Sequence, residues 1–365
     1  MTILPVILII LLLIPVAVLQ VALPYLTRET VSFGVSVSEE VYRSQPVAAM
    51  RQRYTVISSA VYGILIISFT VLAVAADTRL LSVAFPAAVV VMLAANGLIY
   101  YSFYKQMKSL KSSVQQEQPV QQAKWSMDTR FRKQRLTLSN AWYLVPLLLA
   151  AASAVFTWSQ YSEIPARIPM QYDLEGQVTR WADKNVLNVL LPNIMQIGFT
   201  LLLLLINVMI RRSKQQLSPS DPEQSSRTNA VFRYRWSLFN LLTGIALVLL
   251  FSFMQVTMVY HIAPQTSMVV SMMVPILVVI GALYLSFSTG QGGSRMRERG
   301  NHPAYPVNDD SQWKLGAFYY NPSDPSLFVE KRMGIGWTVN MARPAAWLFF
   351  LLPIAIIVVI SIILT

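Results

Sequence analysis

Long apolar runs without formal charges dominate this sequence and constrain what it can fold into. Eight such runs lie at about 3–24, 54–76, 80–104, 139–161, 186–210, 236–260, 266–288 and 344–364. All 29 Lys and Arg and all 17 Asp and Glu fall in the segments between them. About 20 apolar residues in a helix cross the hydrocarbon core of a bilayer, and lipid offers no partners for unpaired backbone groups. The sequence therefore predicts an all-α polytopic membrane protein with about eight transmembrane helices.

The first apolar run is expected to be a retained helix. A cleaved signal peptide has a charged start and a shorter apolar core, whereas Met1 and Thr2 lead directly into about 20 apolar residues. We therefore count it among the eight spans.

The basic residues predict the orientation of the chain. The segments 25–53, 105–138, 211–235 and 289–343 hold 25 of the 29 Lys and Arg, and the alternate segments hold four. Basic residues mark the cytoplasmic side, so both termini are expected outside. The net charge of +12 is then mainly a topology signal, and direct nucleic-acid binding is not expected.

Composition divides the chain into regions. The segment from Ser112 to Gln122 is rich in Ser and Gln, which is typical of a flexible linker, and Trp125 and Phe131 among basic residues indicate an interfacial stretch. We predict a three-helix membrane region at 1–111, a basic cytoplasmic linker at 112–138, a four-helix membrane region at 139–288, a cytoplasmic module at 289–343 and a last transmembrane helix at 344–365.

The predicted outer loop 162–184 has the composition of a structured segment. Two prolines four residues apart stop a helix, alternation around Tyr172 is compatible with a short strand, and Gly176 can form a turn. The loop is either a capped connector or an external recognition surface. The candidate recognition residues are Pro165, Pro169, Gln171, Asp173, Gly176, Trp181, Asp183 and Lys184.

Pro165, Pro169, Gly176, Lys184 and Pro192 together resemble a signature of bacterial membrane proteins. Their domain has no known function, and the family includes the immunity protein against the sporulation-delaying (SDP) toxin of Gram-positive bacteria. The likeness covers about 140–205, with a similar C-terminal module at about 310–344. This chain has Gln171 where the family commonly has His. The resemblance implies a multi-pass protein of a Gram-positive plasma membrane that binds an extracellular peptide toxin and a cytoplasmic repressor.

The predicted cytoplasmic segments contain two further patterns. Aromatic and β-branched runs on either side of an Asn-Pro and Asp-Pro cluster at 321–325 indicate a small β-hairpin. The segment Val31–Val37 predicts a structured turn that contacts the 289–343 segment. Candidate interface residues, expected mainly as membrane-interface anchors, are Trp313, Tyr319, Tyr320, Lys331, Arg332 and Trp337.

Uncharged polar residues enter the spans. Asn185, Asn188, Asn193 and Gln196 fall within about 140° on one helix, with Pro192 among them. They either form interhelical hydrogen bonds or line a polar cleft. Asn96, Asn240 and Gln255 are interpreted in the same way.

The chemistry of common active sites is sparse. The chain has no Cys, and its two His, His261 and His302, are predicted on opposite sides of the membrane, so neither a metal site nor a cofactor is expected. Catalysis would depend on Asp173, Glu175 or Asp183 in the outer loop. The leading hypothesis is a non-enzymatic immunity or signalling protein; the alternatives are a transporter or lipid-handling protein and, third, an envelope enzyme.

Overall fold

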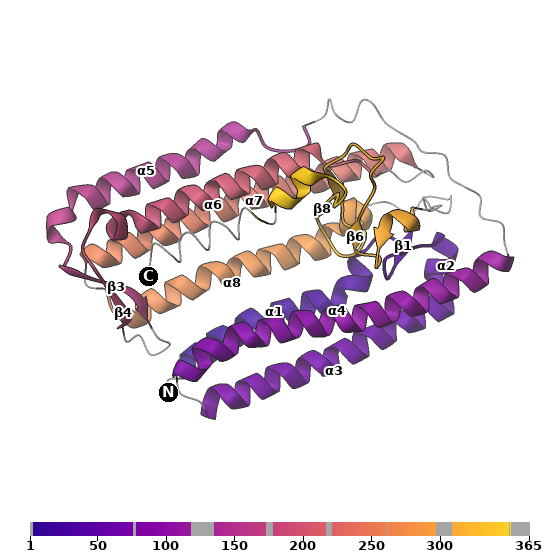
Figure 1. Cartoon of the computed structure of the whole chain (residues 1–365), viewed down its shortest axis with the longest axis horizontal. Helices are drawn as coiled ribbons and strands as arrows, with labels where there is room; N and C mark the ends of the chain where they lie inside the picture. Colours follow the sequence, from indigo (N-terminus) through magenta and orange to yellow (C-terminus); the bar gives the residue numbers. More distant parts are fainter. Residues whose placement is uncertain are drawn as a thin grey trace.

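The computed structural model describes residues 3–75, 78–117, 135–172, 178–216, 221–260, 262–296, 309–349 and 351. Helices build the body of the protein, with α1, α3 and α4 in one group and α5, α6 and α7 in another, and α8 contacts both α1 and α7 (Figure 1). The helices are α1 (Ile3–Leu26), α2 (Glu39–Arg43), α3 (Gln45–Ala75), α4 (Thr78–Glu117), α5 (Leu144–Ser159), α6 (Val186–Arg212), α7 (Pro222–Val259) and α8 (Pro264–Thr289).

Among the residues that the structure describes, six helical segments are long and apolar enough to cross a membrane: Gln45–Ala75, Val83–Ser113, Asn140–Ser159, Val186–Arg212, Pro222–Val259 and Pro264–Met296. They fit the predicted all-α polytopic membrane protein. Helix α1 adds a shorter apolar segment, Ile10–Leu26. Most of the predicted run 344–364 lies outside the described residues, so the count of eight spans and the placement of the termini stay predictions.

The helices continue beyond their apolar runs, which corrects the expectation that every charge lies in a loop. Helix α4 continues through Lys105 and Lys111 to Glu117, because helix-compatible residues follow the apolar run. The predicted linker at 112–138 therefore begins as helix; residues 118–134, with Trp125 and Phe131, lie outside the described part. Helices α3 and α7 likewise include Arg51 and Arg233, and both side chains are buried.

In the described residues, four two-stranded antiparallel hairpins lie at the ends of the helices. They pair β1 (Val31–Ser32) with β2 (Val35–Ser36), β3 (Arg167–Tyr172) with β4 (Val178–Asp183), β5 (Trp313–Lys314) with β6 (Phe318–Tyr319), and β7 (Phe328–Glu330) with β8 (Trp337–Val339).

The single hairpin predicted around 321–325 is wrong in its pairing. The aromatic run before this cluster and the run after it each fold back on themselves, as β5–β6 and β7–β8. Left-handed backbone explains the difference, because Leu315 and Gly316 turn the first run at φ values of 53° and 70°, and Gly334 and Gly336 turn the second. We call residues 309–349, which contain both hairpins, the cap.

The turn at 31–37 contacts the cap, as predicted from the sequence. The Ser36 backbone N–H donates to Asp310 Oδ1 at 3.0 Å. Phe33 is buried against Tyr54 of α3 and Phe103 of α4, with ring centroids 5.5 and 5.2 Å away. Gly34, at φ 76°, lies so close to Gly316 that a Cβ at position 34 would come within 2.6 Å of the Gly316 carbonyl oxygen. The turn thus joins the cap to α3 and α4.

Candidate functional site

The β3–β4 hairpin connects α5 to α6 and is the best-defined part of the predicted recognition loop. Arg167 lies opposite Asp183, Ile168 opposite Ala182 and Pro169 opposite Trp181, before an irregularity near Gln171. Figure 1 places the hairpin at the end of the helices opposite the cap. Two prolines and a strand-like alternation therefore identified a β-structured segment correctly.

Apolar and cationic contacts fix the hairpin to the helix ends. Ile164 and Ile168 are buried with Val189 of α6 in one cluster. Lys184 Nζ donates to the Ile164 carbonyl at 2.8 Å and lies 4.7 Å from the centre of the Tyr161 ring. A short hairpin alone is marginally stable, so these contacts hold its backbone in one position.

The outward side of the hairpin presents mixed chemistry. Trp181 is 53% exposed, and Arg167, Arg180 and Asp183 are exposed as well. Because Ile168 is buried and residues alternate between the faces of a strand, Arg167 and Pro169 belong to the face opposite the helices, where they pair with Asp183 and Trp181. An aromatic side chain flanked by both charges is suited to contacting a peptide.

The other predicted loop residues fall in different places. Pro165 is exposed just before β3, and Gln171 pairs with Arg180 through the backbone. Asp173, Glu175 and Gly176 lie outside the described residues, as do both histidines. Of the three candidate carboxylates in this loop, the structure describes Asp183, which lies at the end of β4.

The predicted polar face of α6 divides into two parts. Asn185 caps the helix by accepting from the Asn188 N–H at 2.8 Å, and Asn188 donates to the Asp183 carbonyl. Asn193 and Gln196, by contrast, are buried between α5, α6 and α7. Pro192 lies between the two pairs inside a helix that continues to Arg212.

The buried pair forms interhelical hydrogen bonds, as one of the two sequence interpretations predicted. Asn193 Nδ2 donates to the Ala150 carbonyl and to Ser153 Oγ of α5, at 3.1 and 3.0 Å. Gln196 Nε2 donates to the Val248 carbonyl and Ser252 Oγ of α7, and Gln255 donates to Asn193 Oδ1. These amides are therefore engaged in helix packing, a use that contributes about 0.6 kcal/mol per bond on average in membranes.

Similar polar contacts follow the same helices toward the cap. Asn240 donates to Tyr143 Oη and to the Leu203 carbonyl, and Ser237 donates to Asn207 Oδ1 at 2.5 Å. Asn96 accepts from Tyr54 Oη at 3.0 Å. Asn96, Asn240 and Gln255 thus have the interhelical role expected from the sequence.

The candidate cytoplasmic interface is mostly interior. Trp313, Tyr319, Arg332 and Trp337 are buried, whereas Tyr320 and Lys331 are exposed. Trp313 packs on Tyr319, and Trp337 packs on Phe232 of α7, with ring centroids 5.0 and 5.2 Å apart. Three of these aromatic residues therefore form the core of the cap and its contact with α7, which corrects the expectation that they anchor at a membrane interface.

A buried ion-pair cluster, which sequence reasoning missed, fastens the cap to the helices. Arg233 and Glu330 have fully buried side chains and pair at 2.9 Å. Arg233 also donates to Asn229 Oδ1, to the Ile210 carbonyl in the last turn of α6 and to the Ser213 carbonyl just after this helix. Arg28, just after α1, pairs with the second Glu330 oxygen. One carboxylate of the cap thus links to the end of α1 through Arg28 and to α7 through Arg233.

The remaining carboxylates of the cap are paired in the same way. Asp310 pairs with Lys111 of α4 and with Arg332, Asp309 pairs with Arg332, and Asp324 pairs with Lys214. All four acidic residues of the described cap therefore form ion pairs, three of them with basic residues next to or within membrane helices. Some of the Lys and Arg that predicted topology thus also dock the cap.

Asp324 makes the stability of the cap sensitive to acid. Burial by itself raises the pKa of Asp324. Hydrogen bonds from Lys214, the Ser326 N–H and Tyr319 together have a larger opposite effect and lower the pKa to about 2. Because the pKa of Asp324 is lower in the folded state, its ionised carboxylate stabilises the fold at pH values above the unfolded pKa near 3.8. That contribution is lost as the pH falls toward 2. We expect Asp324→Asn to lose up to about 2 kcal/mol at pH 7 and less at pH 2. Denaturant titrations of the wild-type protein and the variant between pH 2 and pH 7 measure the free energy of unfolding of each. Equal losses at pH 7 and pH 2 would contradict the predicted role of the Asp324 carboxylate.

The part of the chain that the structure describes contains no evident metal-binding site. No group of three His, Cys, Asp or Glu residues is placed to hold a metal ion there. The site therefore consists of an anchored hairpin at one end of the helices and an ion-paired cap at the other.

Two family models match parts of the chain. Residues 148–196, which include the hairpin, match a domain of unknown function (DUF1648), and residues 322–347 match a family of unknown function (DUF5808). No curated protein and no solved structure matches the chain. The range 148–196 lies within the first stretch where the sequence resembles the family of membrane proteins, and the range 322–347 overlaps most of the second, but neither model names a function.

Proposed function

We propose that this chain is a multi-pass membrane receptor of the toxin-immunity type, which binds an extracellular peptide at the β3–β4 hairpin. The observation that carries the proposal is a rigidly anchored hairpin with an exposed outward face, which includes Arg167, Trp181 and Asp183. Binding residues commonly lie on connecting segments held by a rigid scaffold. The DUF1648 match covers this same segment.

The edges of the hairpin favour an extended peptide as the ligand. The Lys184 N–H donates to the Ala166 carbonyl, so by the alternation of antiparallel pairs the backbone groups of Pro169 and Trp181 face away from the partner strand. Proline has no N–H, which leaves β3 the poorer edge for adding a strand. The β4 edge, beside the exposed Trp181 ring, is then the better place for a peptide strand to dock.

The orientation that the proposal requires follows from charge. With eight spans and both termini outside, the hairpin faces the exterior and the cap faces the cytoplasm, where basic segments predominate. A cytoplasmic regulator would then meet the exposed residues of the cap, Tyr320 and Lys331. We place the protein in the plasma membrane of a Gram-positive bacterium on the family resemblance.

Transport and catalysis receive less support. The amides of Asn193 and Gln196 are buried and bonded across helices, which supports packing over a polar path. Asp183 is an exposed carboxylate next to Arg167, an arrangement more typical of a solvated strand end than of a general acid or base.

Removing the Trp181 ring is expected to weaken protection strongly. Aromatic residues at interface centres commonly contribute 2 kcal/mol or more, which is about 30-fold in affinity. Expression of the wild-type chain should protect a sensitive bacterial host from at least one peptide in a panel of secreted antimicrobial peptides, and Trp181→Ala should lower that protection by at least tenfold. The minimal inhibitory concentration of each peptide is the measurement.

Trp158 provides a matched control, because it is 57% exposed and lies near the same end of α5. Trp158→Ala should leave protection unchanged if Trp181 contacts the peptide. Equal losses in both variants would instead assign both rings to the membrane interface. A host whose sensitivity is unchanged across the whole panel would count against the immunity function itself.

A further inference from the structure

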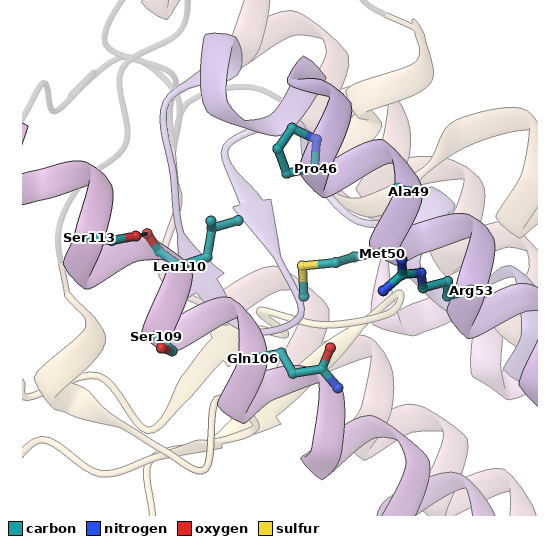
Figure 2. A pocket seen from close by; sticks show the side chains of 8 residues that line it. All are labelled: Pro46, Ala49, Met50, Arg53, Gln106, Ser109, Leu110 and Ser113. Carbon is teal, nitrogen blue, oxygen red and sulfur yellow. Dashed lines mark hydrogen bonds between the residues drawn. The ribbon is translucent and has the colours of Figure 1, made fainter.

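An open groove of about 560 Å³ separates the ends of α3 and α4 on the side of the cap (Figure 2). Met50 and Leu110 point into the space between the helices, and Arg53 and Gln106 lie toward one end of it. The lining residues are Pro46, Ala49, Met50, Arg53, Gln106, Ser109, Leu110 and Ser113. The groove therefore combines an apolar wall with polar and cationic groups.

One end of the groove lies at the depth of lipid headgroups. Arg53 immediately precedes the apolar run of α3, and Gln106 follows the apolar run of α4 by two residues. The headgroup layer adds about 5–7 Å to each side of the hydrocarbon core, which is about one helical turn. Arg53 and Gln106 therefore fall within this layer if both helices span the membrane.

The charge around the groove is positive. Helix α3 contains no Asp or Glu, and the acidic residue of α4 is Glu117 at its last position. Arg51 is engaged elsewhere, because it is buried and donates to the Tyr42 carbonyl at 2.8 Å. Arg53 is exposed and forms no ion pair within the described ranges. Lys105 directly precedes the lining residue Gln106 in α4 and lies over the Tyr101 ring. The groove thus presents a cation that the described part of the protein does not neutralise.

We propose that this groove binds the headgroup of an anionic phospholipid from the membrane leaflet on the cap side. Arg53 contacts the phosphate, Gln106 and Ser109 donate to headgroup oxygens, and Met50 and Leu110 pack against the glycerol region. Basic pockets between transmembrane helices are suited to such headgroups, and the volume is in the range of small-molecule sites. This site is independent of peptide binding at the hairpin, which lies at the other end of the helices.

The full chain in neutral detergent can report on the groove directly. Because it has no Cys, Ser113→Cys introduces one label position at the end of the groove farthest from Arg53. An environment-sensitive fluorophore there should respond to phosphatidylglycerol and not to phosphatidylcholine. Adding Arg53→Gln should weaken the response to phosphatidylglycerol about fivefold, the equivalent of about 1 kcal/mol for one basic residue near an anionic surface. Arg53→Lys should retain most of the binding.

Arg227→Gln is the control, because its side chain is 76% exposed on α7 and away from the groove. It should leave binding unchanged. The proposal is overturned by equal binding of the two lipids, by equal effects of the Arg53 and Arg227 variants, or by an equal response to inorganic phosphate, which would show an ion site only. If, without lipid, the fluorescence changes with protein concentration and native mass spectrometry shows a dimer, the groove would instead bind a second copy of this chain. If Arg53→Gln lowers the melting temperature, the Arg53→Lys variant and the lipid comparison decide the result.

Discussion

Replacing Arg233 by alanine is expected to destabilise the folded protein by about 3–5 kcal/mol, the usual cost of breaking a buried ion pair. The substitution leaves the buried Glu330 with Arg28 as its remaining ion partner, and it removes donors to the Ile210 and Ser213 carbonyls. Because these groups join α6, α7 and the cap, the cap should detach before the helices unfold. Denaturant titration in detergent, with intrinsic Trp fluorescence as the readout, measures the loss.

Arg227→Ala is the matched control on the same helix. Arg227 pairs with Glu223 at 3.2 Å, but both side chains are more than three-quarters exposed. Exposed pairs contribute little, so this substitution should change stability by less than about 0.5 kcal/mol. Similar losses in the two variants would show that burial of the Arg233 pair is not what fastens the cap.

Gly34→Ala is expected to have the second-largest effect. The residue has φ 76°, which is strained for an L-amino acid by about 1–2 kcal/mol, and the new Cβ would lie 2.6 and 2.8 Å from the backbone oxygen and Cα of Gly316. Neither backbone can move without disturbing its own hairpin, so the turn at 31–37 and the β5–β6 hairpin should separate. We expect a loss of at least about 2 kcal/mol and faster limited proteolysis within the cap.

Gly63→Ala controls for the change of residue type. Gly63 lies within α3, where a Cβ would meet nothing within 4 Å. Alanine is the better helix former, so this variant should be neutral or slightly more stable. An unchanged cap in the Gly34 variant would mean that the two turns are not packed as closely as the structure places them.

Periodic and compositional signals predicted the membrane architecture because lipid allows few solutions. The described helices follow the apolar runs, and a short strand in 162–184 was predicted from prolines and alternation, although its pairing as a hairpin was not. Helix ends were less predictable, since α4 and α7 continue through polar sequence that is as compatible with helix as with linker. The pairing within the cap depended on left-handed residues such as Leu315, which carry no strong sequence signal.

The ion-pair cluster was out of reach for a different reason. Arg233 and Glu330 are 97 residues apart, and a topology count treats each as a solvated loop charge. The available signal was local, namely Asn229 one helical turn before Arg233 and a cap whose few carboxylates are outnumbered by nearby basic residues. The polar residues of α6 fall into two groups. Asn185 at the start of the helix caps its backbone, whereas Asn193 in the interior forms hydrogen bonds to a neighbouring helix.

The proposed function requires the β3–β4 hairpin to be an external surface that a peptide covers. A single cysteine at Arg180→Cys, in an otherwise Cys-free chain, tests both parts in intact cells with a membrane-impermeant maleimide. Arg180 is exposed in β4, and Arg227→Cys on α7 serves as the cytoplasmic control. We predict that position 180 is labelled without permeabilisation, that position 227 is not, and that the protecting peptide slows labelling at 180. Labelling at 227 but not at 180, or a labelling rate at 180 that the peptide leaves unchanged, would rule out an external peptide-binding hairpin.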